Sequence, residues 1–121
     1  MLNVTLQPNY GIAIFEMDGQ LSVQDFNHAA HKLAPYIEQA GGLKGCIVCS
    51  TNWPKWDSPY ALLAHLHFIN FHHNYIDKVA LVSDSMSFKW LVPLCTTTLH
   101  CKLRCYSFDA LEQSKAWILL E

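Results

Sequence analysis

The stretch that decides the fold is GCIVCS (45–50), followed by TNWPKWD (51–57) and then by Ser58-Pro59. The first six residues form a short apolar run, which is typical of a strand buried inside a sheet. Ser58 is a favourable helix N-cap and Pro59 a favourable first helical residue, so a helix is expected to follow. The stretch therefore predicts a buried strand, a loop rich in tryptophan and a capped helix in succession.

Weaker forms of the same unit are expected on both sides of this stretch. Apolar runs and period-two alternation predict strands, and apolar residues every three or four positions predict helices. The expected strands cover residues 2–6, 12–17, 44–50, 78–82 and 101–106, with helices at 22–40, from 58, at 86–94 and from 109. The predicted order is β-β-α-β-α-β-α-β-α in one α/β domain, residues 1–121. Strands separated by helices pair in parallel, so we expect a mostly parallel five-stranded sheet, in chain order, with four helices and an antiparallel edge strand at the N-terminus.

Capping residues mark the ends of the first and last helices. Ser22 with Asp25 three residues later matches a capping box, and Gly41-Gly42 is a typical helix end. Pro35 lies inside this helix and is expected to kink it, because proline has no amide hydrogen. Asp109 is expected to cap the final helix in the same way as Ser22.

Composition excludes several classes of function. The net charge is −2 and the basic residues are scattered, so nucleic-acid binding is not expected. No apolar run approaches the roughly 20 residues that cross a bilayer, and no secretory signal is visible, so a cytoplasmic protein without membrane insertion is expected. Only 15% of the residues are charged and 51% are hydrophobic. Apolar surface of that extent favours self-association, so a homodimer is predicted.

Cysteine and histidine patterns predict neither a disulfide framework nor a metal site. Cys46 and Cys49 are three apart on a strand and should point to opposite faces, which does not suit a redox pair. His28 and His31 share one helix but lie off its apolar stripe, so exposed histidines are expected. No spacing of cysteines and histidines matches a known ligand set, and no cofactor is predicted.

A co-linear set of segments runs through nearly the whole chain. Its members are Tyr10-Gly11-Ile12, Gly19-Gln20-Leu21-Ser22 with Asp25-Phe26, Trp56, Leu66-His67-Phe68 with His72-His73, Val79-Ala80-Leu81-Val82-Ser83-Asp84, Trp90-Leu91, Arg104-Cys105-Tyr106 and Ala116-Trp117. Together these segments resemble the small bacterial SpoIIAA-like proteins, relatives of the STAS (anti-sigma-factor antagonist) domain. The resemblance implies a β-α superhelix, commonly a homodimer, and no established catalytic activity. The sequence departs from a typical member at His65, where an acid is common, and at Ser83, where glycine is common.

The resemblance gives Ser58 two interpretations. In anti-sigma-factor antagonists the loop after the central strand carries an Asp-Ser-Ser-Gly-like element whose serine is phosphorylated, and Asp57-Ser58 stands in that place. A phosphate there would be held by free amides at a helix N-terminus. However, Pro59 and Tyr60 replace the rest of the element, and a helix cap also accounts for the serine.

Acidic and aromatic residues gather after the predicted strands. Ligands of open α/β sheets bind at the carboxyl ends of strands, where Asp18, Asp57, Asp84 and Asp109 are expected. Capping of helices alone would also explain these acids, and strands in chain order would spread them apart. Trp53 and Trp56 lie in the same loop as Asp57, and Trp53 is the better candidate for an exposed contact.

The candidate contact residues are therefore Trp53, Trp56, Asp57, Ser58 and Asp84. They favour a non-enzymatic STAS-like binding or regulatory module that contacts a protein partner or a small ligand. One alternative is a carrier of a small apolar ligand or lipid, because many aromatic residues could line a pocket. A weaker alternative is a hydrolase-like enzyme, although the sequence has no G-x-S-x-G element and no phosphate-binding glycine motif.

Overall fold

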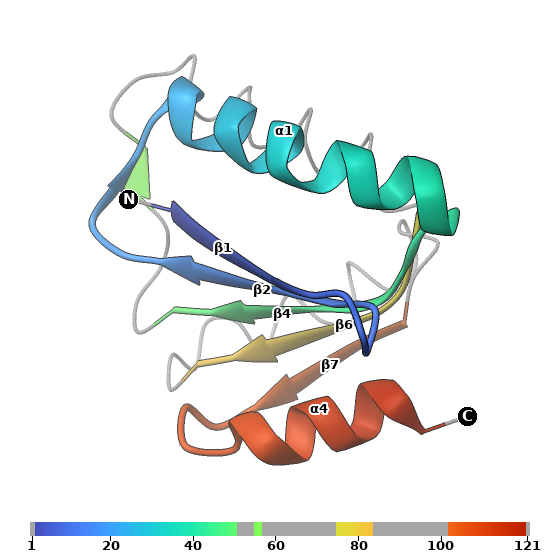
Figure 1. Ribbon diagram of the computed structural model, residues 1–121. Helices are drawn as coiled ribbons and strands as arrows, with labels where there is room; N and C mark the ends of the chain where they lie inside the picture. The colour runs from blue at the N-terminus through green and yellow to red at the C-terminus, as the bar shows by residue number, and fades with distance from the viewer. Residues whose placement is uncertain (1, 51–54, 57–74, 84–101, 121) are drawn as a thin grey trace.

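The computed structural model describes residues 2–50, 55–56, 75–83 and 102–120 (Figure 1). These residues form a five-stranded sheet with helix α1 over one face and helix α4 over the other. The strands of this sheet are β1 (Leu2–Gln7), β2 (Ile12–Met17), β4 (Leu43–Cys49), β6 (Ile76–Val82) and β7 (Lys102–Tyr106), and the helices are α1 (Val23–Ala40) and α4 (Leu111–Leu119). A separate pair consists of β3 (Gln20–Leu21) and β5 (Lys55–Trp56).

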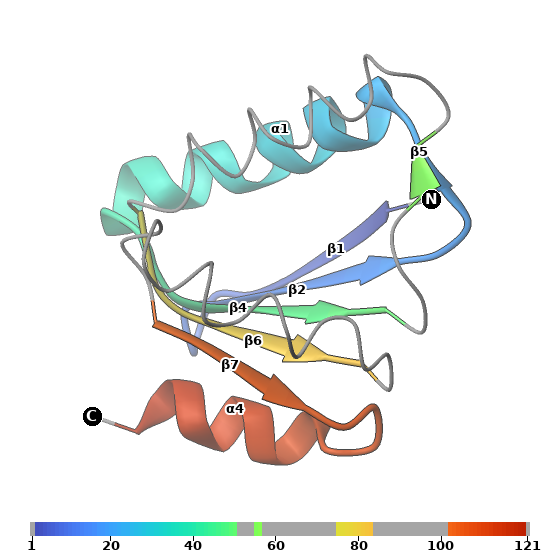
Figure 2. The same cartoon turned by 180° about the vertical axis from the view of Figure 1, so that it is seen from behind.

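The sheet has the order β1-β2-β4-β6-β7, with β4 at its centre. β1 and β2 are antiparallel, from Leu2 opposite Met17 to the hairpin turn. All other neighbours are parallel, and Ile47 of β4 lies opposite Ile14 on one side and Ala80 on the other. This arrangement confirms the predicted mixed sheet, which is mostly parallel with one antiparallel pair. Because β2, β4, β6 and β7 run the same way, their carboxyl ends share one edge (Figure 2).

Helix α1 begins at the predicted capping box. The Asp25 amide donates to Ser22 Oγ at 3.2 Å, and the Ser22 amide donates to Asp25 Oδ2 at 2.8 Å. These two bonds satisfy amide groups that the first helical turn cannot pair. The helix continues through Pro35 and ends at Gly41, whose φ of 81° lies in the left-handed region that glycine adopts without strain.

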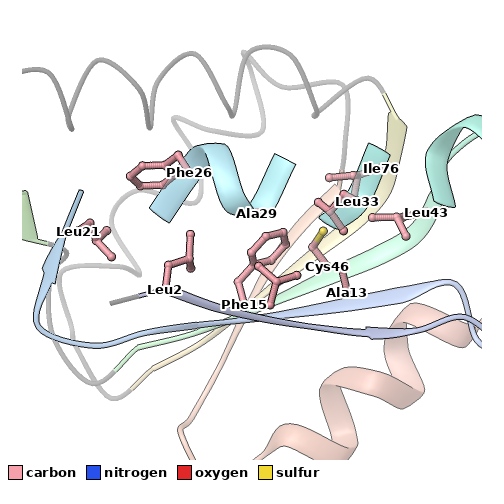
Figure 3. Close-up of a cluster of buried hydrophobic side chains, with 11 residues drawn as sticks. Leu2, Ala13, Phe15, Leu21, Phe26, Ala29, Leu33, Leu43, Cys46 and Ile76 are labelled. Atoms are coloured by element: carbon pink, nitrogen blue, oxygen red, sulfur yellow. The ribbon is translucent and has the colours of Figure 1, made fainter. Parts of the chain in front are cut away.

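The larger hydrophobic core lies between α1 and the sheet (Figure 3). From α1 it takes Phe26, Ala29 and Leu33, which recur at the three- and four-residue spacing of one helical face. The sheet and its connections supply Leu2, Val4, Ala13, Phe15, Leu21, Leu43, Cys46 and Ile76. Phe26, Ala29 and Leu33 thus form the face of α1 that packs on the sheet.

A second core lies between the sheet and α4. Its buried members are Ile12, Ile14, Ile47, Ala80, Val82 and Ile118. Ile118 packs directly over Gly45 of β4, where a Cβ atom would lie 2.5 Å from Ile118 Cγ2. The absence of a side chain at Gly45 therefore allows α4 to approach the centre of the sheet.

The predicted cap of the last helix is wrong. Ala110, not Asp109, is the N-cap of α4, and no side chain bonds to the first turn. Asp109 Oδ1 instead accepts a hydrogen bond from Ser107 Oγ at 2.7 Å. The carboxylate is satisfied within the turn before the helix, because the serine that follows β7 offers a donor two residues away.

Two of the four expected helices lie outside the described residues, namely those from residue 58 and at 86–94. In the part of the chain that the structure describes, no helix is long and apolar enough to cross a membrane.

Candidate functional site

The carboxyl edge of the sheet carries a serine after each of three adjacent strands. Cys49, Val82 and Tyr106 lie opposite one another at the ends of β4, β6 and β7, and Ser50, Ser83 and Ser107 are the next residues. We define the carboxyl edge by these three serines together with Asp18 and Asp109.

The first two serines are buried and fixed to the neighbouring strand. The Ser50 amide donates to the Val82 carbonyl at 3.2 Å, and the Ser83 amide donates to the Tyr106 carbonyl at 3.0 Å. Each serine is only 6% exposed. The loops after β4 and β6 therefore leave the sheet from fixed points, because the first residue of each still belongs to the hydrogen-bond ladder.

The row of serines was not predicted from the sequence, although a signal for it is present there. Each of Ser50, Ser83 and Ser107 directly follows an apolar or aromatic residue that ends a strand. The repeated position of serine relative to the strand ends is that signal, whereas the predicted site relied on acids and tryptophans.

The loop after β4 is also fixed at its far end. β5 pairs in parallel with β3, so that Lys55 lies opposite Gln20 and Trp56 opposite Leu21. Leu21 is completely buried in the core beneath α1, and the next residue is the N-cap of that helix. Both views place β5 beside the segment that enters α1 (Figures 1 and 2). The chain thus passes from the centre of the sheet to the start of α1 within a few residues.

Of the predicted contact residues, only Trp56 falls within the described chain, as part of β5. Its backbone position beside the start of α1 is fixed by the pairing with Leu21. Trp53, Asp57, Ser58 and Asp84 lie outside the described residues.

The acids predicted at strand ends do not all gather in one place. Asp18 follows β2 and Asp109 follows β7, and both are exposed. β4 and β6 lie between these two strands, which separates β2 from β7 by about 14 Å at the usual strand spacing. One ion cannot bridge that distance, so this pair of acids does not form a joint site.

The cysteines have the placement expected from strand alternation. Cys46 is buried in the core beneath α1, whereas Cys49 packs against the core beneath α4. Burial raises the pKa of the Cys49 thiol, the neighbouring Glu16 carboxylate raises it further, and the ammonium of Lys115 acts in the opposite direction. A thiol with a raised pKa is a poor nucleophile at neutral pH. Cys46 and Cys49 therefore do not form a redox pair.

Histidines and acids do not converge on a metal site within the described ranges. His28 and His31 are exposed on α1, as expected from their position off its apolar stripe. No group of three or more histidine, cysteine or acidic side chains in the described part of the chain could hold a metal ion.

The fold and its edge define a class of protein, namely an open α/β domain with loops at the carboxyl ends of parallel strands. A family model described as SpoIIAA-like matches residues 12–119, and the chain belongs to that family. The crystal structure of an uncharacterised DUF3478-family protein with a SpoIIAA-like fold, from Shewanella loihica PV-4, is similar with a TM-score of 0.65 and 16% identity. The match covers 98% of this chain and 92% of that chain. No curated protein matches the sequence.

Proposed function

We propose that this protein is a non-enzymatic STAS-like regulatory module that binds its partner through the loop after β4, residues 51–58. The observation that carries the proposal is the attachment of this loop at two points. Ser50 bonds to β6 at the start of the loop, and Lys55–Trp56 pairs with β3 near its end. Backbone that is already fixed at Ser50 and at Lys55–Trp56 costs less ordering entropy when a partner binds there, which favours affinity.

We assign the contacts with the partner to residue types that are common in protein–protein interfaces. Trp53 and Trp56 are large aromatic residues, and Asp57 and Ser58 are the polar residues that follow them in the sequence. Asp84, which comes two residues after β6 in the sequence, is assigned to the same contact surface. Phosphorylation of Ser58 stays a prediction of the family resemblance, with helix capping as the competing explanation.

Self-association is the second part of the proposal. Exposed apolar side chains are the candidates for contacts in a homodimer. Among the described residues these are Tyr10, Tyr75, Phe108, Leu119 and Leu120, and the last is 66% exposed. A cytoplasmic location stays part of the proposal, because five cysteines without framework spacing do not suit a secreted disulfide scaffold.

Substitution of Trp53 tests the loop directly. Immobilised wild-type protein and the Trp53→Ala variant are compared for quantitative recovery of partners from a lysate of the source cells. His28→Ala is the matched control, because His28 is an exposed ring on α1. We expect Trp53→Ala to reduce recovery and His28→Ala to leave it unchanged. Equal recovery by wild type and Trp53→Ala would contradict the proposal that this loop contacts the partner.

A further inference from the structure

A cationic and aromatic surface lies at the opposite side of the sheet from β1, and the proposed loop does not use it. Alternation along β7 places Lys102, Arg104 and Tyr106 on the face that α4 covers. Trp117 of α4 lies beside them, with its ring centroid 6.3 Å from that of Tyr106. We call Lys102, Arg104, Tyr106 and Trp117 the β7 face.

The guanidinium of Arg104 is held in place by the two rings. Its Cζ lies 5.6 Å from the Tyr106 centroid and 5.9 Å from the Trp117 centroid. Cation–π attraction to both rings favours this position of the group while its N–H donors stay available for a carboxylate, which it can bind in a bidentate manner. Arg104 is exposed, so this prearranged donor faces a partner rather than the protein interior.

The charges on the β7 face are not neutralised by ion pairs within the described part of the protein. Neither Lys102 nor Arg104 takes part in the ion pair between Lys115 and Glu112 of α4. Lys78 is a different case, because its Nζ donates to the carbonyls of Trp117 and Leu120 and so holds the end of α4. The surface thus offers two cations to a partner, on a chain whose net charge is −2.

From this geometry we infer that the β7 face binds an extended acidic segment of a partner protein. Lys102 and Arg104 are two residues apart on one strand, which separates them by about 6.6 Å along it. Carboxylates at alternate positions of an extended peptide have the same spacing and lie on one side of that peptide. Charge complementarity therefore selects an acidic strand as the occupant.

Other occupants fit this surface less well. Two copies of β7 that pair with each other would bring like charges together, which opposes a contact between identical faces. Two cations release too few counterions to hold a nucleic acid tightly at physiological salt. A free phosphate would meet donors on an open surface instead of a pocket closed around it.

The test uses the full-length 15N-labelled protein and two short synthetic peptides. One has two aspartates separated by a threonine, and the other has the same composition with the aspartates adjacent. We expect the first peptide to shift amide signals of β7 and the indole N–H signal of Trp117, and to bind more tightly than the second. Affinity should fall as salt is raised, because the contact is between exposed charges.

Variants assign the binding to particular side chains. Arg104→Gln and Lys102→Gln should each weaken binding about twofold to fivefold, the range for one exposed ion pair, and together about tenfold. Lys44→Gln is the matched control, since Lys44 is also exposed and lies outside this face. All variants are compared only after their amide spectra confirm the wild-type fold.

Several outcomes would overturn the inference. Equal binding of both peptides, or an unchanged affinity of the double variant, would show that the spacing of Lys102 and Arg104 plays no part. Stronger shifts of the same signals with inorganic phosphate, or with an oligonucleotide, would show that the β7 face binds that ligand and not an acidic segment. Shifts that depend on protein concentration without peptide would make the β7 face a contact between copies.

Discussion

The close approach of α4 to β4 gives a prediction whose magnitude follows from the structure. In Gly45→Ala the new Cβ would lie 2.5 Å from Ile118 Cγ2 and 2.9 Å from Cγ1 and Cδ1 of the same side chain. Ile118 is 3% exposed and β-branched, so it has few ways to move aside. Overpacking of this kind costs about 1–3 kcal/mol, and we expect Gly45→Ala to lower the free energy of unfolding by that amount.

A double-mutant cycle separates this clash from other effects. Ile118→Ala removes all three atoms that the new Cβ would meet, and on its own should cost about 2–5 kcal/mol through the cavity that it leaves. In that background Gly45→Ala should be nearly neutral, or stabilising by a few tenths of a kcal/mol, because alanine restricts the unfolded chain. The coupling energy between the two substitutions should therefore be about 1–3 kcal/mol.

The assay is urea unfolding of the two single variants and the double variant, followed by circular dichroism. Gly41→Ala is the control, because no atom lies within 4 Å of the position that its new methyl group would take, and its cost comes from a φ of 81°. That cost should be the same with isoleucine or alanine at position 118. Additive effects of Gly45→Ala and Ile118→Ala, to within about 0.5 kcal/mol, would refute the packing of α4 on the centre of the sheet.

Three other predictions concern local interactions. Ser22→Ala should lower the free energy of unfolding by about 1 kcal/mol through loss of the α1 cap, and an unchanged urea midpoint would contradict the capping box. Lys78→Met should lower the free energy of unfolding by about 1 kcal/mol, because the ammonium of Lys78 is lost and no longer bonds to the last carbonyls of α4. Amide hydrogen exchange in α4 should then become faster, and unaltered exchange would argue against this anchor. Burial raises the pKa of the Cys49 thiol and the Glu16 carboxylate raises it further, so Glu16→Gln should increase the thiolate fraction and the rate of iodoacetamide alkylation at about pH 8. Lys115→Gln should decrease both, because the ammonium lowers this pKa. Peptide mapping by mass spectrometry measures both rates, and a change in the same direction for the two variants would contradict the assigned environment.

The sheet could be predicted from sequence because its signals are local and mutually consistent. The apolar run at 45–50 predicted a buried strand, and β4 is the central strand of the sheet. Ser22 with Asp25 predicted the start of α1, and Gly41 predicted its end, because few other residue types form these caps. Strand alternation also placed Cys46 and Cys49 on opposite faces.

Other features depend on contacts between distant segments and were not visible in local patterns. The pairing of Trp56 with Leu21 joins two strands of two residues each, which are too short to show any periodicity. Asp109 matched the pattern of a cap, but Ser107 offered its carboxylate a nearer donor. The surface around Arg104 required knowledge that Trp117 of α4 lies over the face of β7. Of the candidate contact residues only Trp56 lies within the described chain, so the assignment of the site to the loop after the central strand stays a prediction.

The central claim is that this protein acts as a binding module through its surface and carries no small molecule in its interior. Native mass spectrometry of freshly purified protein measures the number of subunits and any retained ligand in one spectrum. We predict dimers whose mass is twice that of the chain, without a bound small molecule. Monomers that retain one apolar molecule per chain would contradict the claim and identify the protein as a carrier.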